Sequence, residues 1–185
     1  MSRTVLTLVV TVFVASSGTS AATAALSDYY TSAGVGNNTF ATYIATNINE
    51  TWRGYVRYGI TAWNGTYSST GTALATTTSS TSIRKAGIGN LPSGWLGSYS
   101  YGGTRANRSF QITIDATQII NSPDRTASIG AFAQYASMHE FGHALSLKDN
   151  PNTTSTSIMK YRYANWSSPY QSPRTYDIAN VASIY

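Results

Sequence analysis

Two histidines four residues apart are the residues of this chain best suited to chemistry. The chain has 185 residues but only two histidines, His139 and His143, and Glu140 directly follows the first of them. On a helix, residues i and i+4 project from one face, one turn apart, so both imidazoles can bind the same cation. Glu140 points about 100° away from His139 around the helix axis, so it can hold a water beside the ion without binding the ion itself. The H-E-x-x-H pattern therefore predicts a zinc site with a flanking carboxylate.

A zinc site that keeps one position open for water or substrate needs a third protein ligand. The chain has no cysteine and no third histidine, and its only other glutamate, Glu50, precedes the motif. Downstream of the motif, carboxylates occur only at Asp149 and Asp177. On a continuous helix Asp149 would lie about 9 Å beyond His143, so it can reach the ion only if the helix ends and the chain turns back. We expect Asp149 to be the third ligand, with Asp177 as the alternative.

The elements expected to position the motif are two long helices with strands between them. Asn47-Ile48-Asn49-Glu50 resembles a capping box, and apolar residues follow at helical spacing up to Asn64-Gly65, which predicts a helix over residues 47–64. A second helix, starting near Ser122-Pro123-Asp124, carries the histidines, and residues 173–185 are expected to form a terminal helix. The segments predicted as strands are 40–46, 73–76, 82–88, 95–101 and 110–114. This order of elements favours an α+β arrangement.

The motif and the residues after it resemble the metzincin zinc endopeptidases. The signature of that clan, H-E-x-x-H-x-x-G-x-x-H/D, is similar to residues 139–149, and Ser157-Ile158-Met159 resembles the methionine turn that follows it. The closing segment 176–185 is similar to the terminal helix of matrixin-like members, and small secreted snapalysin-like members use aspartate as third ligand, as at Asp149. The resemblance implies a metzincin-like zincin fold of class α+β. Such a fold has a twisted mixed sheet, a backing helix, an active-site helix and a small C-terminal subdomain with the methionine turn and terminal helix.

The resemblance also implies an activity and a role for each residue of the motif. His139, His143 and Asp149 would bind one catalytic zinc ion. Glu140 would be the general base, which takes the proton of a zinc-bound water. The implied protein is a zinc metalloendopeptidase that hydrolyses peptide bonds in a protein or peptide substrate. The sequence specifies no calcium requirement.

Three further positions are interpreted through the resemblance. Met159 would lie beneath the metal, and Tyr161 matches the tyrosine that astacin-like and serralysin-like members place beside the metal to stabilise the oxyanion. Ser146 departs from the clan, which has glycine where the helix ends. A left-handed conformation there would cost a non-glycine residue roughly 1–2 kcal/mol, which is small beside the about 10–16 kcal/mol of apparent binding free energy at structural zinc sites. Asp177, in Thr175-Tyr176-Asp177, echoes the T-x-D ligand of aspzincins but would otherwise be a structural hydrogen-bond acceptor.

The N-terminus has the pattern of a cleaved secretory signal. Arg3 precedes an almost wholly apolar run over residues 5–14, and Ala22-Thr23-Ala24 offers a small-x-small cleavage site, with Thr19-Ser20-Ala21 competing. The alternative, a membrane anchor, would need about 20 apolar residues. We therefore expect a secreted, extracellular product.

The predicted organisation is a signal peptide at residues 1–24 and a single metalloprotease catalytic domain at residues 25–185, whose upper subdomain covers about 25–147 and lower subdomain about 148–185. The formal net charge is +5, but the basic residues are scattered and form no stripe, so no nucleic-acid partner is expected. No membrane association is expected after signal cleavage, and the product is expected to be a monomer. The alternative function is a catalytically inactive, secreted metzincin-like binding or adhesion module, against which the intact Glu140 argues.

Overall fold

The computed structural model of the chain describes residues 30–122, 128–150, 152–160 and 170–185. The predicted signal peptide at residues 1–24 and Tyr161 lie outside these ranges. The strands are β1 (Thr39–Ile44), β2 (Ala73–Thr77), β3 (Arg84–Ile88), β4 (Gly97–Gly102) and β5 (Ser109–Ile114). The helices are α1 (Glu50–Asn64), α2 (Tyr67–Thr70), α3 (Ala116–Asn121), α4 (Ile129–Ala144) and α5 (Thr175–Ile184), with a 3₁₀ turn, η2, at Arg105–Asn107. Among these described helices, none combines the length and the apolar character needed to cross a membrane.

The strands form one five-stranded sheet in the order β2-β1-β3-β5-β4. Four of them run parallel, and β4 pairs antiparallel with β5 at one edge. Parallel neighbours need a long crossover, and α1 with α2 supplies it between β1 and β2. Period-two burial appears in β5, where Phe110, Ile112 and Ile114 are buried, as the alternation in the sequence predicts.

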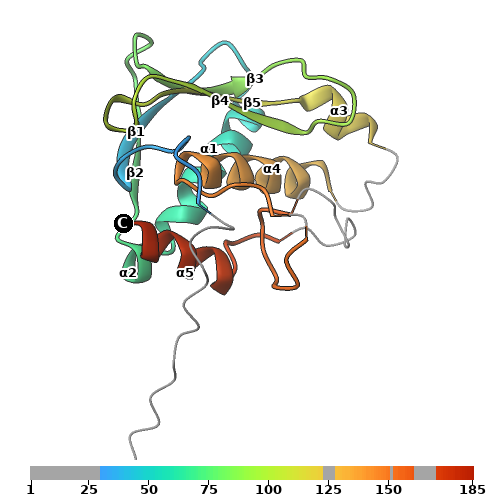
Figure 1. Ribbon diagram of the computed structural model, residues 1–185. Helices are drawn as coiled ribbons and strands as arrows, with labels where there is room; N and C mark the ends of the chain where they lie inside the picture. The colour runs from blue at the N-terminus through green and yellow to red at the C-terminus, as the bar shows by residue number, and fades with distance from the viewer. Residues whose placement is uncertain (1–29, 123–127, 151, 161–169) are drawn as a thin grey trace, which may run out of the picture.

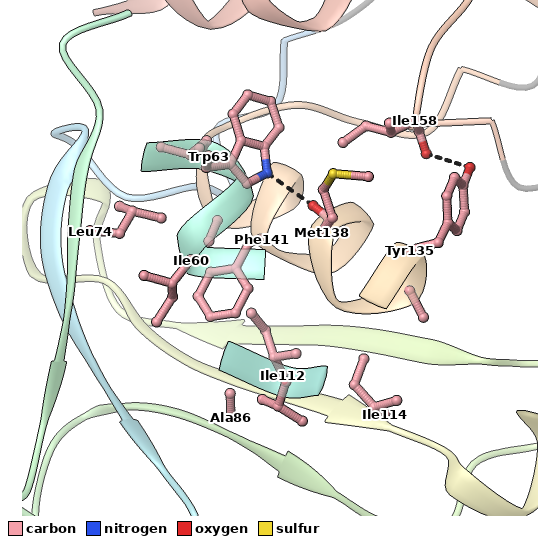
Figure 2. Close-up of a cluster of buried hydrophobic side chains, with 14 of the residues drawn as sticks. Ile60, Trp63, Leu74, Ala86, Ile112, Ile114, Tyr135, Met138, Phe141 and Ile158 are labelled. Atoms are coloured by element: carbon pink, nitrogen blue, oxygen red, sulfur yellow. Dashed lines mark hydrogen bonds between the residues drawn. The ribbon is translucent and has the colours of Figure 1, made fainter. Parts of the chain in front are cut away.

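Helices α1 and α4 lie against the same face of the sheet, and α5 lies on their far side (Figure 1). The core fills the space between the sheet and helices α1 and α4 (Figure 2). Trp63 of α1 is fully buried, and its indole Nε1 donates a 3.0 Å hydrogen bond to the carbonyl of Met138 in α4. This hydrogen bond therefore fixes the position of α4 relative to α1, and with it the place of the polar side chains of α4.

The helix ends differ in detail from the sequence prediction. Helix α1 begins after Asn49, whose side chain accepts from the amide of Trp52 at 3.0 Å, so the prediction of Asn47 as the cap is wrong. Helix α4 begins after Ser128 rather than near residues 122–124, of which 123 and 124 lie outside the described ranges. Helix α3 was not predicted; it follows Asp115, whose carboxylate caps it.

A close approach of α1 to α4 is possible because residue 59 has no side chain. A Cβ at Gly59 would lie 2.5 Å from Cδ2 of Phe141 and 2.6 Å from Oγ of Ser137. That hydroxyl donates a 2.6 Å hydrogen bond to the carbonyl of Val56, one turn from Gly59. The contact between the two helices is thus backbone to side chain, with no space for a methyl group.

This packing gives a matched pair of predictions on one helix. Gly59→Ala should lower the free energy of unfolding by about 1–3 kcal/mol, because the new methyl group overlaps two side chains of α4. Gly54→Ala adds a methyl group that meets no atom within 4 Å, so it should raise the free energy of unfolding by about 0.5–1 kcal/mol through helix propensity. Urea denaturation followed by circular dichroism measures both, and equal effects of the two substitutions would contradict the close approach.

Candidate metal centre

The two histidines of α4 face each other across one helical turn. Their ring centroids lie 4.8 Å apart, with the rings nearly perpendicular. Nδ1 of His139 lies 2.8 Å from the carbonyl oxygen of Ile158, and Nδ1 of His143 lies 2.8 Å from that of Leu147. Because a carbonyl oxygen only accepts, each Nδ1 carries a hydrogen, so Nε2 is the nitrogen of each ring that can offer a lone pair to a metal once it is unprotonated.

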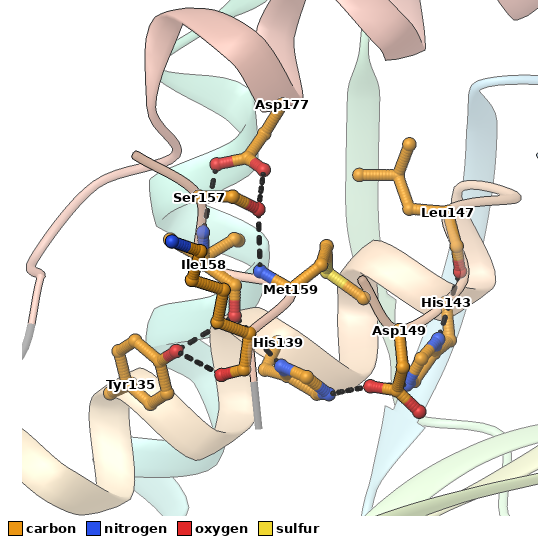
Figure 3. Close-up of polar contacts among 10 residues, drawn as sticks. Tyr135, His139, His143, Leu147, Asp149, Ser157, Ile158, Met159 and Asp177 are labelled. Atoms are coloured by element: carbon orange, nitrogen blue, oxygen red, sulfur yellow. Dashed lines mark hydrogen bonds and ion pairs between the residues drawn. The ribbon is translucent and has the colours of Figure 1, made fainter. Parts of the chain in front are cut away.

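The chain reverses after α4 and brings Asp149 back to the two rings (Figure 3). The helix ends at Ala144, and Ser146 has φ = 68°, the only positive φ at a non-glycine position in the described part of the chain. Oδ1 of Asp149 lies 3.0 Å from Nε2 of His139 and 3.6 Å from Nε2 of His143. The left-handed residue considered at position 146 is therefore observed, and the turn it makes places the carboxylate where a continuous helix could not.

These three side chains fit a zinc ion. One donor atom from each of His139, His143 and Asp149 lies within 4.8 Å of the others. Two ligands that each lie about 2.1 Å from a tetrahedral ion are roughly 3.4 Å apart. The two distances from the Asp149 oxygen, 3.0 and 3.6 Å, bracket this value. Two imidazole nitrogens and one carboxylate oxygen also form a donor set that zinc prefers.

The electrostatics of the cluster favour one positive charge, on His139, and disfavour a second one on His143. Burial lowers the pKa of His139, but the hydrogen bond to Asp149 and the nearby charge of Glu140 outweigh it and raise that pKa to about 9. Burial and the neighbouring His139 lower the pKa of His143 to about 4. Although burial opposes it, the hydrogen bond to His139 holds the pKa of Asp149 below its usual value. Burial raises the pKa of Glu140 to about 7, against the lowering influence of His139.

Glu140 lies beside the metal ligands, under the edge strand β4. Its side chain is only 5% exposed, and a Cβ at Gly97 would lie 2.5 Å from its Oε1. A cleft of about 510 Å³ runs between β4 and α4, and Glu140, both histidines and Asp149 line it. Trp95 and Tyr101, each more than half exposed, line the same cleft. The carboxylate therefore lies between the ligand cluster and β4, the edge strand of the described sheet.

A turn at residues 157–159 supports the cluster from below. Met159 is fully buried under α4, where a Cβ at Gly142 would lie 2.6 Å from its sulfur. The carbonyl of Ile158 accepts from Nδ1 of His139 and also from the hydroxyl of Tyr135, both at 2.8 Å. The contact between Tyr135 and Ile158 was not predicted from the sequence, because the spacing of these two residues gives no sign of it.

Asp177 holds this turn and is not part of the ligand cluster. It is fully buried, and its carboxylate accepts from the hydroxyl of Ser157 at 2.5 Å and from the amides of Ile158 at 3.0 Å and Arg174 at 2.8 Å. Figure 3 shows it on the opposite side of the turn from the histidines. The alternative role as third ligand is therefore replaced by the structural one. Tyr161, the predicted oxyanion partner, lies outside the described residues.

Comparison with known proteins gives a likeness of fold. No protein-family model matches the chain, and no curated protein matches it significantly. Among solved structures, the chain is similar to a chain of the ECX AB5 holotoxin in its GM1-bound form. The two are 16% identical, the match covers 85% of this chain and 84% of that chain, and the TM-score is 0.55. At this identity the likeness concerns the fold alone.

This likeness corrects the fold class predicted from the sequence. The chain is a small mixed α/β domain that shares the fold of the holotoxin chain, and the metzincin-like zincin fold predicted as its class is set aside. The physical reason is that the motifs behind that prediction lie in residues 139–185, whereas the order and direction of the strands are set by residues 39–114. A local motif specifies its own turn of helix but not the sheet on which that helix packs.

The three bonds accepted by Asp177 predict a large structural effect. Asp177→Ala should lower the free energy of unfolding by about 3 kcal/mol or more, because it leaves buried N–H and O–H donors without their acceptor, at about 1–3 kcal/mol each. Asp177→Asn retains one acceptor oxygen and should cost less. Chemical denaturation of both variants measures the effect, and a loss below about 1 kcal/mol for the alanine variant would contradict the assignment.

Proposed function

We propose that the chain is a secreted, zinc-dependent endopeptidase. The observation that carries the proposal is the convergence of two imidazole Nε2 atoms and one carboxylate oxygen beside a buried glutamate, all lining one cleft. His139, His143 and Asp149 would hold the ion. Three protein ligands leave a position for substrate or water, whereas structural zinc sites are usually closed by four.

The chemistry divides between the ion and the chain. Zinc, when bound, lowers the pKa of a coordinated water from about 15.7 toward about 7 and polarises a carbonyl oxygen. Glu140 would accept a proton from the attacking water on its carboxylate and pass it to the departing amine. Its burial and its contact with Gly97 hold this carboxylate in one place beside the cleft. Water and substrate would therefore meet a fixed base.

The shape of the cleft supports a polypeptide substrate. Among the described strands, β4 pairs with β5 alone, so its other edge, along the cleft, offers backbone groups to an added strand. A peptide bound there in an extended form would pass over Glu140 and the two histidines. The exposed rings of Trp95 and Tyr101 line the same cleft and offer apolar surface to its side chains. The secretory signal predicted at residues 1–24 supports an extracellular site of action.

The metal part of the proposal predicts a defined loss. The wild-type chain should bind about one zinc ion and gain thermal stability from it, because a ligand that binds only the folded state stabilises that state. Asp149→Ala should lower the zinc affinity by more than about 100-fold, since it removes an atom that would bind the ion and not only a residue that supports a ligand. Competition against a chromophoric chelator measures the affinity. Glu50→Gln, which removes an exposed carboxylate on α1, is the matched control and should leave it unchanged.

The catalytic part predicts a separation of activity from metal binding. Glu140→Gln should lower kcat/KM for peptide hydrolysis by about 10²–10⁴-fold while the zinc affinity stays at the wild-type value, because Glu140 supplies a proton acceptor and not a ligand. Cleavage of casein or a quenched fluorescent peptide measures the rate. The control is Glu50→Gln, which replaces the chain's other glutamate and should retain full activity.

The same assay distinguishes the alternative function. A folded, zinc-loaded wild-type chain that cleaves no peptide, or cleaves it equally well with a chelator present, would refute the endopeptidase and favour a non-catalytic binding module. Undiminished cleavage by Glu140→Gln would refute the role of the base.

A further inference from the structure

The first described residues form a segment that lies against residues 144–147, the turn between the candidate ligands His143 and Asp149. This segment, residues 30–36, is called the strap. The amide of Thr31 donates to the carbonyl of Ser146 at 2.8 Å, and the amide of Val35 donates to that of Ala144 at 2.9 Å. Tyr30 forms an antiparallel bridge with Leu147. The strap thus pairs with the backbone on both sides of the left-handed residue.

The strap and the turn touch with no space between them. A Cβ at Gly34 would lie 2.3 Å from both the amide nitrogen and Oγ of Ser146, and 2.6 Å from its Cα. Real side chains do not tolerate such distances, so any residue larger than glycine must displace either the strap or the turn. Ser146 is itself fully buried, so the turn has no solvent-facing side into which it could relax.

A buried arginine ties the strap to the sheet. Arg108 is 5% exposed, and its guanidinium donates to the carbonyls of Ser32 at 2.6 Å and Gly34 at 3.3 Å. The same group donates to the carbonyls of Gly102 at 3.3 Å and Gly103 at 2.5 Å, where the β4–β5 connection begins. One charged group therefore joins two segments through neutral acceptors, in a fork geometry that lysine cannot reproduce.

Two tyrosine hydroxyls complete the attachment. Tyr185 donates to the carbonyl of Val35 at 2.7 Å, and its hydroxyl lies 3.0 Å from Oγ of Ser146. Tyr99, whose ring lies 6.0 Å from that of His143, donates to the carbonyl of Ala33 at 2.9 Å. The strap is held from the C-terminus, from the edge strand and from the turn itself.

The turn held in this way controls two of the three candidate ligands, His143 just before it and Asp149 just after it. Leu147 is the residue that bridges to Tyr30, and its carbonyl accepts the hydrogen bond that orients the ring of His143. Asp149 lies two residues after Leu147, and its reach depends on the left-handed residue at position 146. A shift of the turn would therefore rotate one imidazole and move the carboxylate at the same time.

We propose that the strap is a positioning element of the metal centre, and that Gly34 and Arg108 are its positioning residues. The inference rests on the proposed zinc site. The strap acts by holding residues 144–147, which fix the geometry of His143 and Asp149.

The test compares Gly34→Ala with Gly54→Ala in the full chain. Zinc affinity is measured by chelator competition, ligand geometry by the visible absorption spectrum of the Co²⁺-loaded protein, and fold by far-UV circular dichroism. Gly34→Ala should lower zinc affinity by about 10–100-fold, as the loss of support for a ligand usually does, and should alter the Co²⁺ spectrum. Gly54→Ala, where a methyl group meets nothing, should stay within about twofold of the wild type.

Two further variants keep the inference open to refutation. Arg108→Lys keeps the charge but not the fork, and should change the Co²⁺ spectrum in the same direction as Gly34→Ala. Tyr185→Phe removes a single hydroxyl from a half-buried ring, and decides the question if the other variants do not fold. Zinc affinity within about twofold of the wild type and an unchanged spectrum in the folded variants would overturn the strap's role. A wild-type chain that binds neither metal would instead overturn the proposed function.

Discussion

The candidate metal centre depends on two hydrogen bonds from histidine rings to backbone carbonyls. Nδ1 of His139 donates to Ile158, and Nδ1 of His143 donates to Leu147, each at 2.8 Å. These bonds choose the tautomer, fix the angle of each ring and leave both Nε2 atoms facing Asp149. Since both acceptors are backbone atoms of segments that follow α4, the metal-binding geometry is only as firm as those two segments.

Each segment is held by buried polar groups that lie far away in the sequence. The Ile158 segment is fixed by Asp177 of α5 from one side and by the hydroxyl of Tyr135 from the other. The Leu147 segment is fixed by the strap and by Tyr185. Residues from both ends of the described chain thus converge on one helical turn. A ligand set built in this way is pre-organised, because the entropy of ordering the two segments is lost on folding and not on metal binding.

The sequence could predict the parts of this arrangement that are local. H-E-x-x-H places two rings on one face whatever the fold around it, and the short list of carboxylates narrows the third ligand to Asp149 or Asp177. The left-handed conformation at Ser146 was considered through the resemblance, which has glycine at that position, and it is observed. The period-two burial of β5 is equally local, and the alternation in its sequence predicted it.

The parts that could not be predicted depend on contacts between distant residues. The role of residues 30–36 could not be predicted, because nothing in their own composition shows that Arg108 will bind their carbonyls. Helix α1 was predicted to begin at Asn47 because two asparagines compete there, and only the backbone decides that Asn49 caps it. The fold class was misassigned for a similar reason, since the strand order rests on parallel pairings across long crossovers.

The shared fold with a holotoxin chain leaves the chemistry to be argued from the site. There the decisive feature is that the three donors lie at the wall of an open cleft and not inside the core: Asp149 is 44% exposed, whereas the histidines that face it are 9% and 16% exposed. A purely structural ion would be enclosed on all sides, but an ion held here would face the same space as Glu140 and the edge of β4 that no other described strand pairs with, an arrangement that supports the proposed peptide hydrolysis.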